Sequence, residues 1–566
     1  MKKALLICMS VLSISLGFAQ SEINDIKQTG KSNQLSISQY GNPKILNITQ
    51  DGEENTSDIT QGHKEDPSVD GIIIQSQTGD QNKAFISQMG AYNEVYQTQN
   101  GDINTANASQ GFLSNYNRIE QIQNGKSNIA TATTKNFSLG SQIKQEQNGN
   151  ENNAQAISFN ASTIHQIQTG FTNTALINSS GNSGNIKQNQ SGSNNKATAD
   201  QIRNNNIAQM QKGEENNSNA IQKGAGNEIY QSQTGSYNVT IASQNEQTNS
   251  ILQSQNGQEN YNKTDQSGSF NNTVTNQTGE NNSVIIKQSG LTNTINSNQN
   301  GMLNSSVITQ NGDTNEITQS QDGNENQSRI EQNNGGNNII SQKQTGSNNS
   351  ATAIQNNGVL NIISQTQNGL RNTISTTQES GEKNEAIIVQ NGEANSITQI
   401  QSDGNNNLVA ARQEGSHAHT INQTQNGEKN TSTAFQKNGE YNLIQQIQTG
   451  LNNSAKATQF NGTYDIVKQT QIGDMNITEA FQGENSSFSV NNIIIQTQEG
   501  NENTIFSIQN GTENNIESTQ IGDLNSTNTT QIGNSNSIIY SQSGKGLSST
   551  LLQNGESNSI VFSQNK

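Results

Sequence analysis

The sequence predicts an all-β fold, an amyloid-like, two-sided β-solenoid in which each stacked rung of about 22 residues comprises a strand, a turn, a second strand and a second turn. Three observations predict it. Glutamines recur every 11 residues from Gln211 to Gln332, residues alternate in polarity within each interval, and only 27% of the residues are hydrophobic and 13% charged. A short unit of this kind cannot bury a face alone, so it must stack on copies of itself.

Each 11-residue unit predicts one strand and one turn. Between Asn282 and Gln288 the even-numbered side chains point to one side and the odd-numbered ones to the other, which is the period of a β-strand. The same parity recurs in residues 33–39 and 558–564. The four residues between one Gln and the next Asn, such as 278–281, have turn composition, with Gly supplying a positive φ.

The repeated Gln and Asn are expected to form ladders. Stacked at about 4.8 Å, each inward amide would meet its own kind one rung away and could donate and accept along the stack. This matters because a buried amide without a partner costs about 1 to 3 kcal/mol. The predicted ladder residues are Gln211, Gln222, Gln233, Gln244, Gln255, Gln266, Gln277, Gln288, Gln299 and Gln310, with Asn216, Asn227, Asn238, Asn249, Asn260, Asn271, Asn282 and Asn293, and the turn glycines are Gly213, Gly224, Gly235, Gly257, Gly268, Gly279 and Gly290.

A second pattern indicates two strands per rung. A doublet Gln-x-Gln recurs mostly every 21 to 24 residues, from Gln75 and Gln77 to, after a slip of half a repeat, Gln469 and Gln471. Alternate strands instead carry a small residue at the equivalent position, such as Ala220. Because two sheets pack about 10 Å apart, a large residue facing a small one would fill the space between them.

The N-terminus has the pattern of a secretory signal peptide. Lys2 and Lys3 precede an apolar run at residues 4–16, and Ala19 precedes the expected cut ahead of Gln20. The exported chain would then contain no cysteine, so disulfides are not expected. No later apolar stretch is long enough to cross a bilayer.

The expected domain organisation is therefore simple. Residues 1–19 are the signal peptide, and residues 20–566 are a single array of half-repeats of about 11 residues. Irregular turns are expected near residues 62–76, 130–146 and 483–495.

The charge distribution argues against several partners. The formal net charge is −17 and no basic patch with interleaved aromatics occurs, so nucleic acid is not an expected partner. Acidic residues such as Glu214 and Glu215 concentrate in the predicted turns. Stacked carboxylates could bind calcium, but the acids shift position from turn to turn. We expect them instead to discourage lateral aggregation.

Neither a catalytic nor a metal or cofactor site is expected. His417 and His419 have a spacing that could chelate on a strand, but no Cys or carboxylate converges on them in the sequence, which favours a loop insertion. His63 lies in a charged insertion, and His165 flanks a Gln doublet. A β-helix enzyme would need Asp, Arg or His converging on one face, so we expect no enzyme.

The unit resembles a known repeat. Gln233, Gly235 and Asn238, followed by Gln244, resemble the curlin repeat of curli fibre subunits, and the resemblance covers residues 23–566. Dozens of copies in phase make the resemblance specific. This chain has many more repeats than the familiar subunits, and no Gly-rich leader precedes them.

The resemblance implies a secreted amyloid subunit that polymerises on a bacterial surface into biofilm matrix fibres. It also implies an outer-membrane secretion pore, chaperones and a nucleating partner subunit. The leading hypothesis is therefore a self-assembling fibre protein that can adhere to host or abiotic surfaces. The alternative is a non-polymerising solenoid adhesin or a rod that binds a surface or a polysaccharide.

Overall fold

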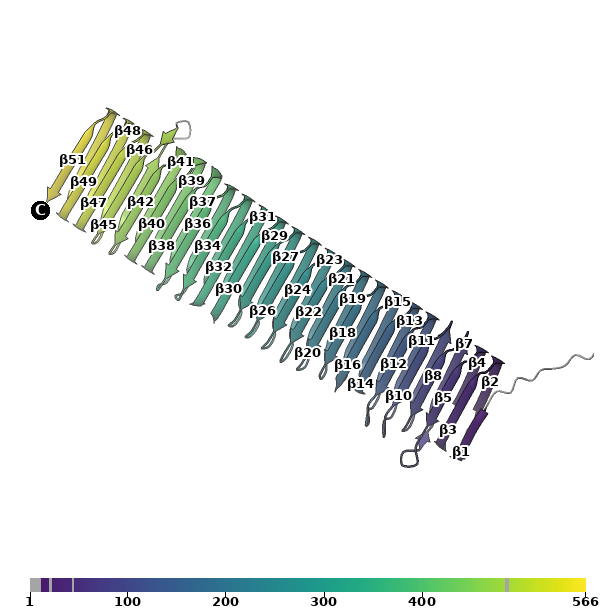
Figure 1. Ribbon diagram of the computed structural model, residues 1–566. Coiled ribbons are helices and arrows are strands. Elements are labelled where there is room, and N and C mark those ends of the chain that lie inside the picture. The colour runs from purple at the N-terminus through teal and green to yellow at the C-terminus, as the bar shows by residue number, and fades with distance from the viewer. Residues whose placement is uncertain (1–11, 20–22, 43–44, 484–487) are drawn as a thin grey trace, which may run out of the picture. The chain divides into compact units, whose positions relative to one another are not determined.

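The computed structural model describes residues 12–19, 23–42, 45–483 and 488–566. These residues form 51 β-strands and no helix, divided between two compact units, unit 1 (Met1–Glu280) and unit 2 (Asn281–Lys566). Each unit is a solenoid of two parallel sheets, termed the A sheet and the B sheet, whose strands stack side by side (Figure 1). The predicted fold class is therefore confirmed.

The strands of unit 1 alternate between its two sheets. The A sheet contains β1 (Leu12–Ala19), β3 (Gln34–Asn42), β5 (Thr56–Gln61), β6 (Ser68–Val69), β8 (Lys83–Gln88), β10 (Thr105–Gln110), β12 (Ile129–Thr134), β14 (Asn153–Asn160), β16 (Thr174–Asn182), β18 (Lys196–Gln201), β20 (Asn217–Gln222), β22 (Val239–Gln244) and β24 (Tyr261–Gln266). The B sheet contains β2 (Ile23–Lys31), β4 (Ile45–Glu53), β7 (Ile72–Thr78), β9 (Glu94–Asn100), β11 (Arg118–Lys126), β13 (Gln142–Asn150), β15 (Thr163–Phe171), β17 (Asn185–Ser193), β19 (Asn206–Glu214), β21 (Glu228–Ser236), β23 (Ser250–Gln258) and β25 (Asn272–Glu280).

Unit 2 is built in the same way. Its A sheet contains β26 (Ser283–Gln288), β28 (Ser305–Gln310), β30 (Gln327–Gly336), β32 (Ser350–Val359), β34 (Thr373–Glu379), β36 (Ser396–Ser402), β38 (Thr420–Glu428), β40 (Leu443–Leu451), β42 (Ile466–Ile472), β45 (Ile493–Glu499), β47 (Asn515–Asp523), β49 (Ser537–Lys545) and β51 (Ser559–Asn565). Its B sheet contains β27 (Thr294–Met302), β29 (Glu316–Asn324), β31 (Ile339–Ser347), β33 (Ile362–Leu370), β35 (Glu385–Glu393), β37 (Leu408–His417), β39 (Thr431–Glu440), β41 (Ser454–Thr463), β43 (Ile477–Gln482), β44 (Ser489–Val490), β46 (Thr504–Thr512), β48 (Ser526–Asn534) and β50 (Ser548–Glu556).

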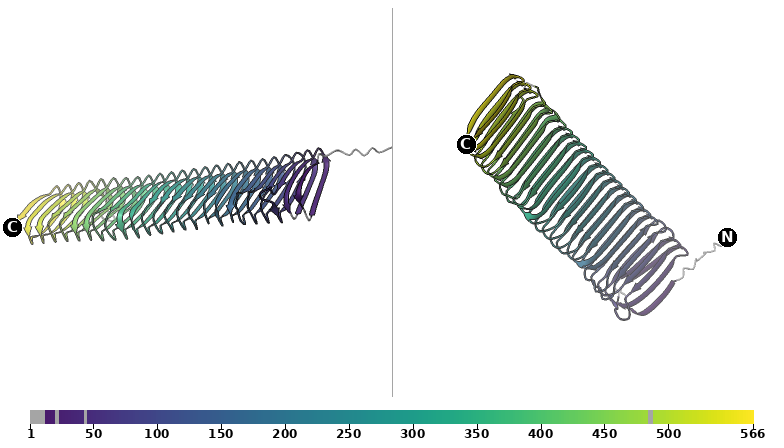
Figure 2. Two further views of the ribbon diagram at one scale, coloured as in Figure 1. Left: turned by 90° about the horizontal axis from the view of Figure 1, so that it is seen from below. Right: turned by 60° about the vertical axis from the view of Figure 1, so that its left-hand side comes forward.

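Strands of neighbouring rungs pair in parallel and in register. β19 pairs with β21 so that Gln211 faces Gln233 and Gly213 faces Gly235, and β20 pairs with β22 in the same way. Figure 2 shows the two layers within each unit. Because each rung repeats the one before, every side chain lies beside its own equivalent, which is the condition for a ladder.

The core is a thin layer between the two sheets. In the B sheet of unit 1, Ile207, Ile229 and Ile251 form one buried column, and Ala220 and Ala242 of the A sheet belong to the same cluster. Burying an Ile contributes about 1.5 to 3 kcal/mol. The apolar column is narrow, so the polar side chains buried beside it must also be satisfied.

One rung of unit 1 lacks an apolar core. The inward side chains of β24 and β25 are all polar, and Gln253 Nε2 donates to Asn262 Oδ1 (2.9 Å) and Thr264 Oγ1 (3.1 Å). Gln266 Nε2 donates across the core to Thr273 Oγ1 at 3.0 Å. This rung is held by hydrogen bonds in place of apolar packing.

The stretches expected to be irregular are extended connections. Residues 62–76 include the two-residue strand β6, and residues 483–495 include the similar β44, with residues 484–487 outside the described residues. In residues 130–146 the strands remain regular, since β12 pairs in register with both β10 and β14. The irregularity there is confined to the turn between β12 and β13.

The predicted signal peptide is only partly within the described residues. Residues 1–11 lie outside them, as does the expected cut ahead of Gln20. Residues 12–19 form β1, which pairs in parallel with β3. Cleavage at the predicted position would remove β1 and leave that edge of β3 unpaired.

The half-repeat slip exchanges the roles of the two sheets within unit 2. The doublet glutamine Gln365 lies on β33 of the B sheet, whereas its next equivalent, Gln399, lies on β36 of the A sheet. The small residue moves the opposite way, from Ala353 on β32 to Ala411 on β37. The sequence predicted the slip, and the fold shows that large and small residues change walls together.

Candidate self-assembly site

The inward glutamines form the ladders that the sequence predicted. Gln211 Nε2 donates to Gln233 Oε1 at 2.8 Å, and Gln233 Nε2 donates to Gln255 Oε1 at 3.0 Å. Many of these amide nitrogens also donate across the core to a main-chain carbonyl of the other sheet, as Gln211 does to Lys196 O at 2.9 Å and Gln233 does to Asn217 O at 3.1 Å. In Gln211 and Gln233 both amide hydrogens are therefore used, one along the stack and one between the sheets, which avoids the cost of burying them.

These ladders run through many rungs. In the B sheet, Gln-to-Gln bonds of 2.6 to 3.0 Å continue from Gln28 to Gln277 in unit 1. Bonds of 2.7 to 3.1 Å continue from Gln299 to Gln553 in unit 2. The A sheet of unit 1 is less regular, because Thr134 takes the place of a ladder Gln there.

The asparagines form separate ladders at the turns. Asn216 Oδ1 accepts from the main-chain N–H of Asn238 at 3.1 Å and from Asn238 Nδ2 at 3.0 Å. Asn216 Nδ2 donates to the carbonyl of Gly235, in the turn one rung on, at 2.8 Å. The interval from Gln to Gly to Asn therefore places the Asn amide where it can bond to two groups of the next rung.

The turn glycines are required by close approach as well as by conformation. Gly235 has φ +110°, and a Cβ there would lie 1.9 Å from the carbonyl oxygen of Gly257. Gly213 and Gly257 would each place a Cβ 2.0 Å from the next carbonyl. The residue before nearly every ladder Asn also has a positive φ, such as Tyr237 at +58°. The residue types found before the ladder Asn gave no indication of this positive φ.

The predicted ladder residues occupy four positions of the rung, one Gln and one Asn position for each sheet. Gln211, Gln233, Gln255, Gln277 and Gln299 lie in the B sheets, and Gln222, Gln244, Gln266, Gln288 and Gln310 lie in the A sheets. Asn216, Asn238, Asn260 and Asn282 precede A strands, and Asn227, Asn249, Asn271 and Asn293 precede B strands. Gly213, Gly224, Gly235, Gly257, Gly268, Gly279 and Gly290 all have positive φ.

The doublet glutamines also bond to the opposite wall. Gln231 Nε2 donates to Gln253 Oε1 at 2.9 Å and to Asn219 O at 3.1 Å, beside Ala220. Gln446 does the same with Thr433 O at 2.9 Å. The small residue opposite each doublet therefore does more than leave space. It lets the amide reach the facing main chain.

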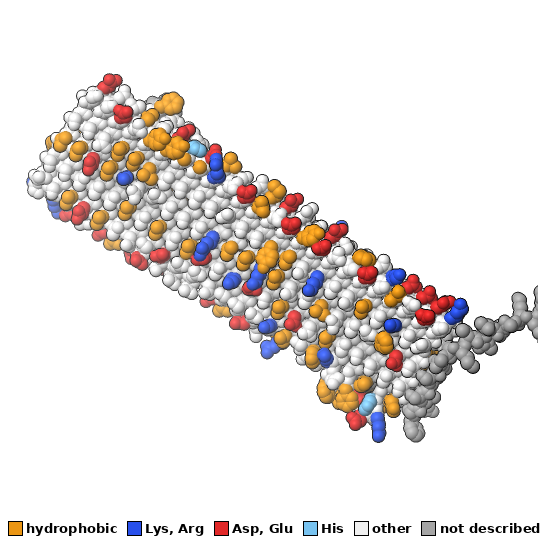
Figure 3. Space-filling model, viewed as in Figure 1, with side chains coloured by type: hydrophobic (Ala, Val, Ile, Leu, Met, Phe, Trp, Pro, Cys, Tyr) orange, Lys and Arg blue, Asp and Glu red, His pale blue; other side chains and the backbone are white. Residues whose placement is uncertain are grey.

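Several turn carboxylates have a structural role that the sequence analysis missed. Asp80 Oδ1 accepts from the main-chain N–H of Glu53 at 2.9 Å, Asp313 accepts from Leu291 at 2.9 Å, and Asp474 accepts from Leu451. Each such Asp follows a turn Gly and ties its turn to the turn one rung earlier. Figure 3 shows the acidic side chains gathered largely along the turns.

The histidine pair is not the loop insertion that we expected. His417 ends β37, with Glu393 3.9 Å from its Nδ1, and His419 is fully buried at a position of the Asn ladder. His419 Nδ1 accepts from the N–H of Asn442 at 3.1 Å, and its Nε2 lies 3.2 Å from Asn438 O. This pattern needs the neutral ring, because Nδ1 must accept.

Acid is expected to weaken the rung that contains His419. Burial lowers the pKa of His419 from 6.5 to about 4, so as the pH falls from 6.5 towards 4 the unfolded segment binds a proton that the folded one does not. Protection of the Asn442 amide against hydrogen exchange, corrected for intrinsic rate, should fall on the order of 100-fold between pH 7 and 4.5.

The matched control is His419→Asn, which restores the residue found elsewhere in that ladder. It should remove the acid-dependent loss while keeping the acceptor for Asn442. An equal loss of protection in the variant would contradict the role given to His419.

The rung formed by β50 and β51 shows what an unpaired rung presents. Gln553 Nε2 is buried and has no hydrogen-bond partner among the described residues. A Cβ on Gly555 would meet only Asn558 Nδ2, at 3.3 Å, whereas one on Gly533 would lie 1.9 Å from Gly555 O. Phe562 stacks on Tyr540 with ring centroids 5.6 Å apart, yet Phe562 is 40% exposed and Tyr540 only 1%. This edge has the groups of an interior rung, and no described strand pairs with its outer side.

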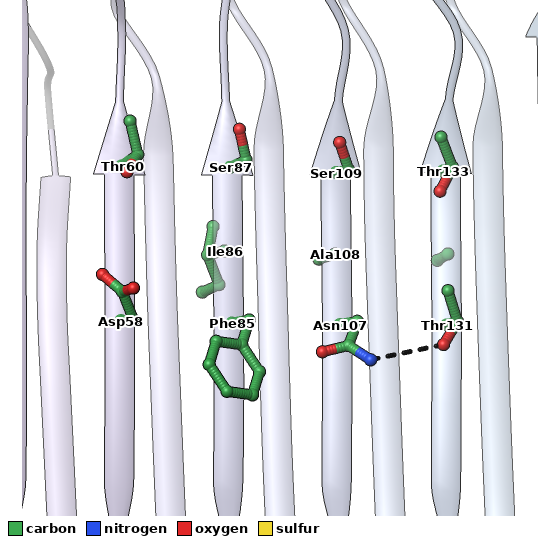
Figure 4. A pocket seen from close by; sticks show the side chains of 11 residues that line it. Asp58, Thr60, Phe85, Ile86, Ser87, Asn107, Ala108, Ser109, Thr131 and Thr133 are labelled. Atoms are coloured by element: carbon green, nitrogen blue, oxygen red, sulfur yellow. Dashed lines mark hydrogen bonds between the residues drawn. The ribbon is translucent and has the colours of Figure 1, made fainter.

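The outer faces hold shallow hollows. One, of about 310 Å³, lies on the A sheet of unit 1 over Asp58, Phe85, Asn107 and Thr131, with Asn107 Nδ2 donating to Thr131 Oγ1 at 3.4 Å (Figure 4). Asp58 is its single ionisable lining residue. No group of three or more His, Cys, Asp or Glu side chains suited to a metal ion occurs among the described residues.

The described residues include no helix long and apolar enough to cross a membrane. Comparisons of the sequence with models of known protein families and with curated proteins found no match. The ladders and the unpaired rung are therefore the observations on which a function can be based.

Proposed function

We propose that this protein is a secreted structural subunit that self-assembles, rung on rung, into curli-like amyloid fibres serving biofilm matrix and surface adhesion. The carrying observation is the unpaired rung of β50 and β51, with the buried Gln553 Nε2 lacking an acceptor and Phe562 half-exposed. An arriving rung that supplied a Gln, a Gly and an Asn at the same spacing would continue every ladder. The primary partner is therefore another copy of the chain.

The first described rung supports this partner. The intervals of two and five residues that separate Gln553 from Gly555 and Asn558 also separate Gln28 from the Gly and Asn that follow it. In both rungs the B strand pairs with its neighbour in register, Gln28 with Gln50 and Gln553 with Gln531. A parallel strand edge with unpaired N–H and C=O groups readily accepts another strand. Export through an outer-membrane pore and a nucleating subunit remain part of the proposal.

Fibre formation is tested on the purified chain lacking residues 1–19. We expect thioflavin fluorescence to rise with time and fibre diffraction to show reflections at about 4.8 and 10 Å. A discrete monomer in sedimentation after days at neutral pH would instead favour the non-polymerising rod.

A lysine at the inward edge of the unpaired rung is expected to slow fibre growth. Phe562→Lys would place an ammonium group in the core of the junction once the next rung stacked, without a carboxylate beside it. Seeded elongation followed by thioflavin fluorescence should slow at least about tenfold, equivalent to about 1.4 kcal/mol.

The control uses the neighbouring residue. Val561 is 75% exposed and points outward, so Val561→Lys adds the same charge to the same strand without entering the core. Its elongation rate should match that of the unchanged protein. Equal slowing by both variants, or by neither, would contradict growth through β51.

A further inference from the structure

The two faces of unit 2 carry far fewer acidic side chains than its turns. In the described part of unit 2, acids such as Asp322, Glu325 and Glu428 lie in the turns, between a ladder Gln and the next ladder Asn. Few of its acids point outward from the strands. With a net charge of −17, two copies approaching turn to turn would repel each other. Approach through a sheet face avoids this.

One region of the A sheet has no charge at all. The neutral face consists of the outward side chains, three per strand, within residues 350–354, 373–377, 396–400, 420–424 and 443–447 of β32, β34, β36, β38 and β40. All are exposed or half-exposed, and most are Ser, Thr or Ile. Charged residues border it on β30 and β42, for example Arg329 and Lys468.

The neutral face is complementary to itself. Along successive strands, the first and last outward residues are Ser350 and Ile354, then Thr373 and Thr377, then Ser396 and Ile400. A two-fold axis along the stack would set the first column of one copy against the last column of another. On β32, β34, β36 and β38 each Ser of these columns would then face an Ile and each Thr a Thr, so the summed volume stays nearly constant over these four rungs. On β40 Leu443 would face Ile447, which adds an apolar contact at that end of the face.

We infer that the neutral face is a lateral interface, through which a fibre of this protein binds a second copy of itself face to face. The inference rests on the proposed function. Five rungs at about 4.8 Å and five residues at about 3.3 Å cover about 400 Å² per copy, which totals less than a stable two-protein interface. Single chains therefore stay apart, whereas fibres, which repeat the face along their length, associate by multivalency.

The inference is tested by cross-linking at the middle of the face. Thr398 lies in the central outward column, which the two-fold axis brings against itself. The chain lacking residues 1–19 contains no cysteine, so Thr398→Cys introduces a single thiol. Fibres of this variant, treated with a short bismaleimide, should give about tenfold more covalent dimer than soluble chains at equal concentration.

Ser364→Cys is the matched control, because Ser364 is a half-exposed central outward residue of the B sheet. Dimer yields equal to those of Thr398→Cys would overturn the inference. Thr398→Lys should separate bundled fibres into single ones in electron micrographs without slowing thioflavin growth, and Ser364→Lys should leave the bundles intact. Bundles that survive Thr398→Lys would also overturn it.

Failure of the two proposals is distinguishable. If neither the unchanged chain nor any variant forms fibres, the proposed function fails. The lateral interface then fails too, because it requires the neutral face to be repeated along a fibre. If fibres form but the cross-link is not above the control, the lateral interface alone fails. Loss of binding to crystalline cellulose in Thr398→Lys, with no excess cross-link in Thr398→Cys, would assign the face to a polysaccharide instead.

Discussion

Replacing Gly235 with Ala is expected to unstack the rungs on either side of it and to destabilise them locally by more than about 4 kcal/mol. Two effects add. The new Cβ would lie 1.9 Å from the carbonyl oxygen of Gly257, a main-chain atom held in a regular stack, and the residue would keep φ at +110°. Relief requires the turns to move apart, which breaks the bond from Asn216 Nδ2 to Gly235 O.

Hydrogen exchange measured by mass spectrometry on the full chain would reveal this loss rung by rung, which suits an array whose rungs need not unfold together. The control is Gly140→Ala. Gly140 also has a positive φ, +73°, but nothing lies within 4 Å of its Cβ position. It should cost only about 1 kcal/mol. Similar losses in both variants would show that conformation, not stacking distance, sets the glycine requirement.

Replacing Gln233 with Glu is expected to have a comparable effect with almost no change in shape. Gln233 Nε2 donates to Gln255 Oε1 at 3.0 Å and to Asn217 O at 3.1 Å, and Gln233 is buried. A carboxylate would oppose two acceptor oxygens and bury an unpaired charge, lowering local stability by about 3 to 5 kcal/mol.

The effect should depend on pH in a defined direction. Burial would raise the pKa of the introduced carboxyl, so the variant's stability is retained below the unfolded value of about 4.3 and lost as the pH rises through the folded pKa. The rate of fibre growth, followed by thioflavin fluorescence at pH 4 and pH 8, would check this. The control is Gln155→Glu, because Gln155 is an exposed outward residue of β14. Fibres of this variant should grow at the same rate at both pH values. Growth of Gln233→Glu at pH 8 equal to that of the unchanged chain would contradict a continuous ladder.

Much of the architecture could be predicted because the period of a repeat is recorded in the sequence itself. The 11-residue interval at Gln211, Gln222 and Gln233 fixed the strand and turn lengths, and the doublets fixed two strands per rung. Alternation along the strand then assigned Gln and Ile to the inside. Each of these is a property of residues close together in the chain.

The partners of individual atoms could not be predicted. That Gln211 donates to Lys196 O, that Asn216 donates to Gly235 O, and that His419 occupies an Asn position depend on which groups the other strand and the next rung bring within 3 Å or so. The sequence pattern alone placed His419 in a loop. A pattern shows that the residue type differs from Asn, but it does not show that the His side chain fills the same space in the fold.

The sequence by itself therefore determined the rung: its length, its two unlike strands, its inward residues and the position of its glycines. Only the tertiary structure decided how rungs meet. It assigned the ladder residues to their sheets, gave the turn aspartates such as Asp80 a main-chain partner, and placed the large and small core residues on opposite walls on either side of the slip between Gln365 and Gln399. The physical reason is that a period follows from local chain geometry, whereas hydrogen-bond partners and charge-free faces arise when residues some 22 positions apart lie side by side.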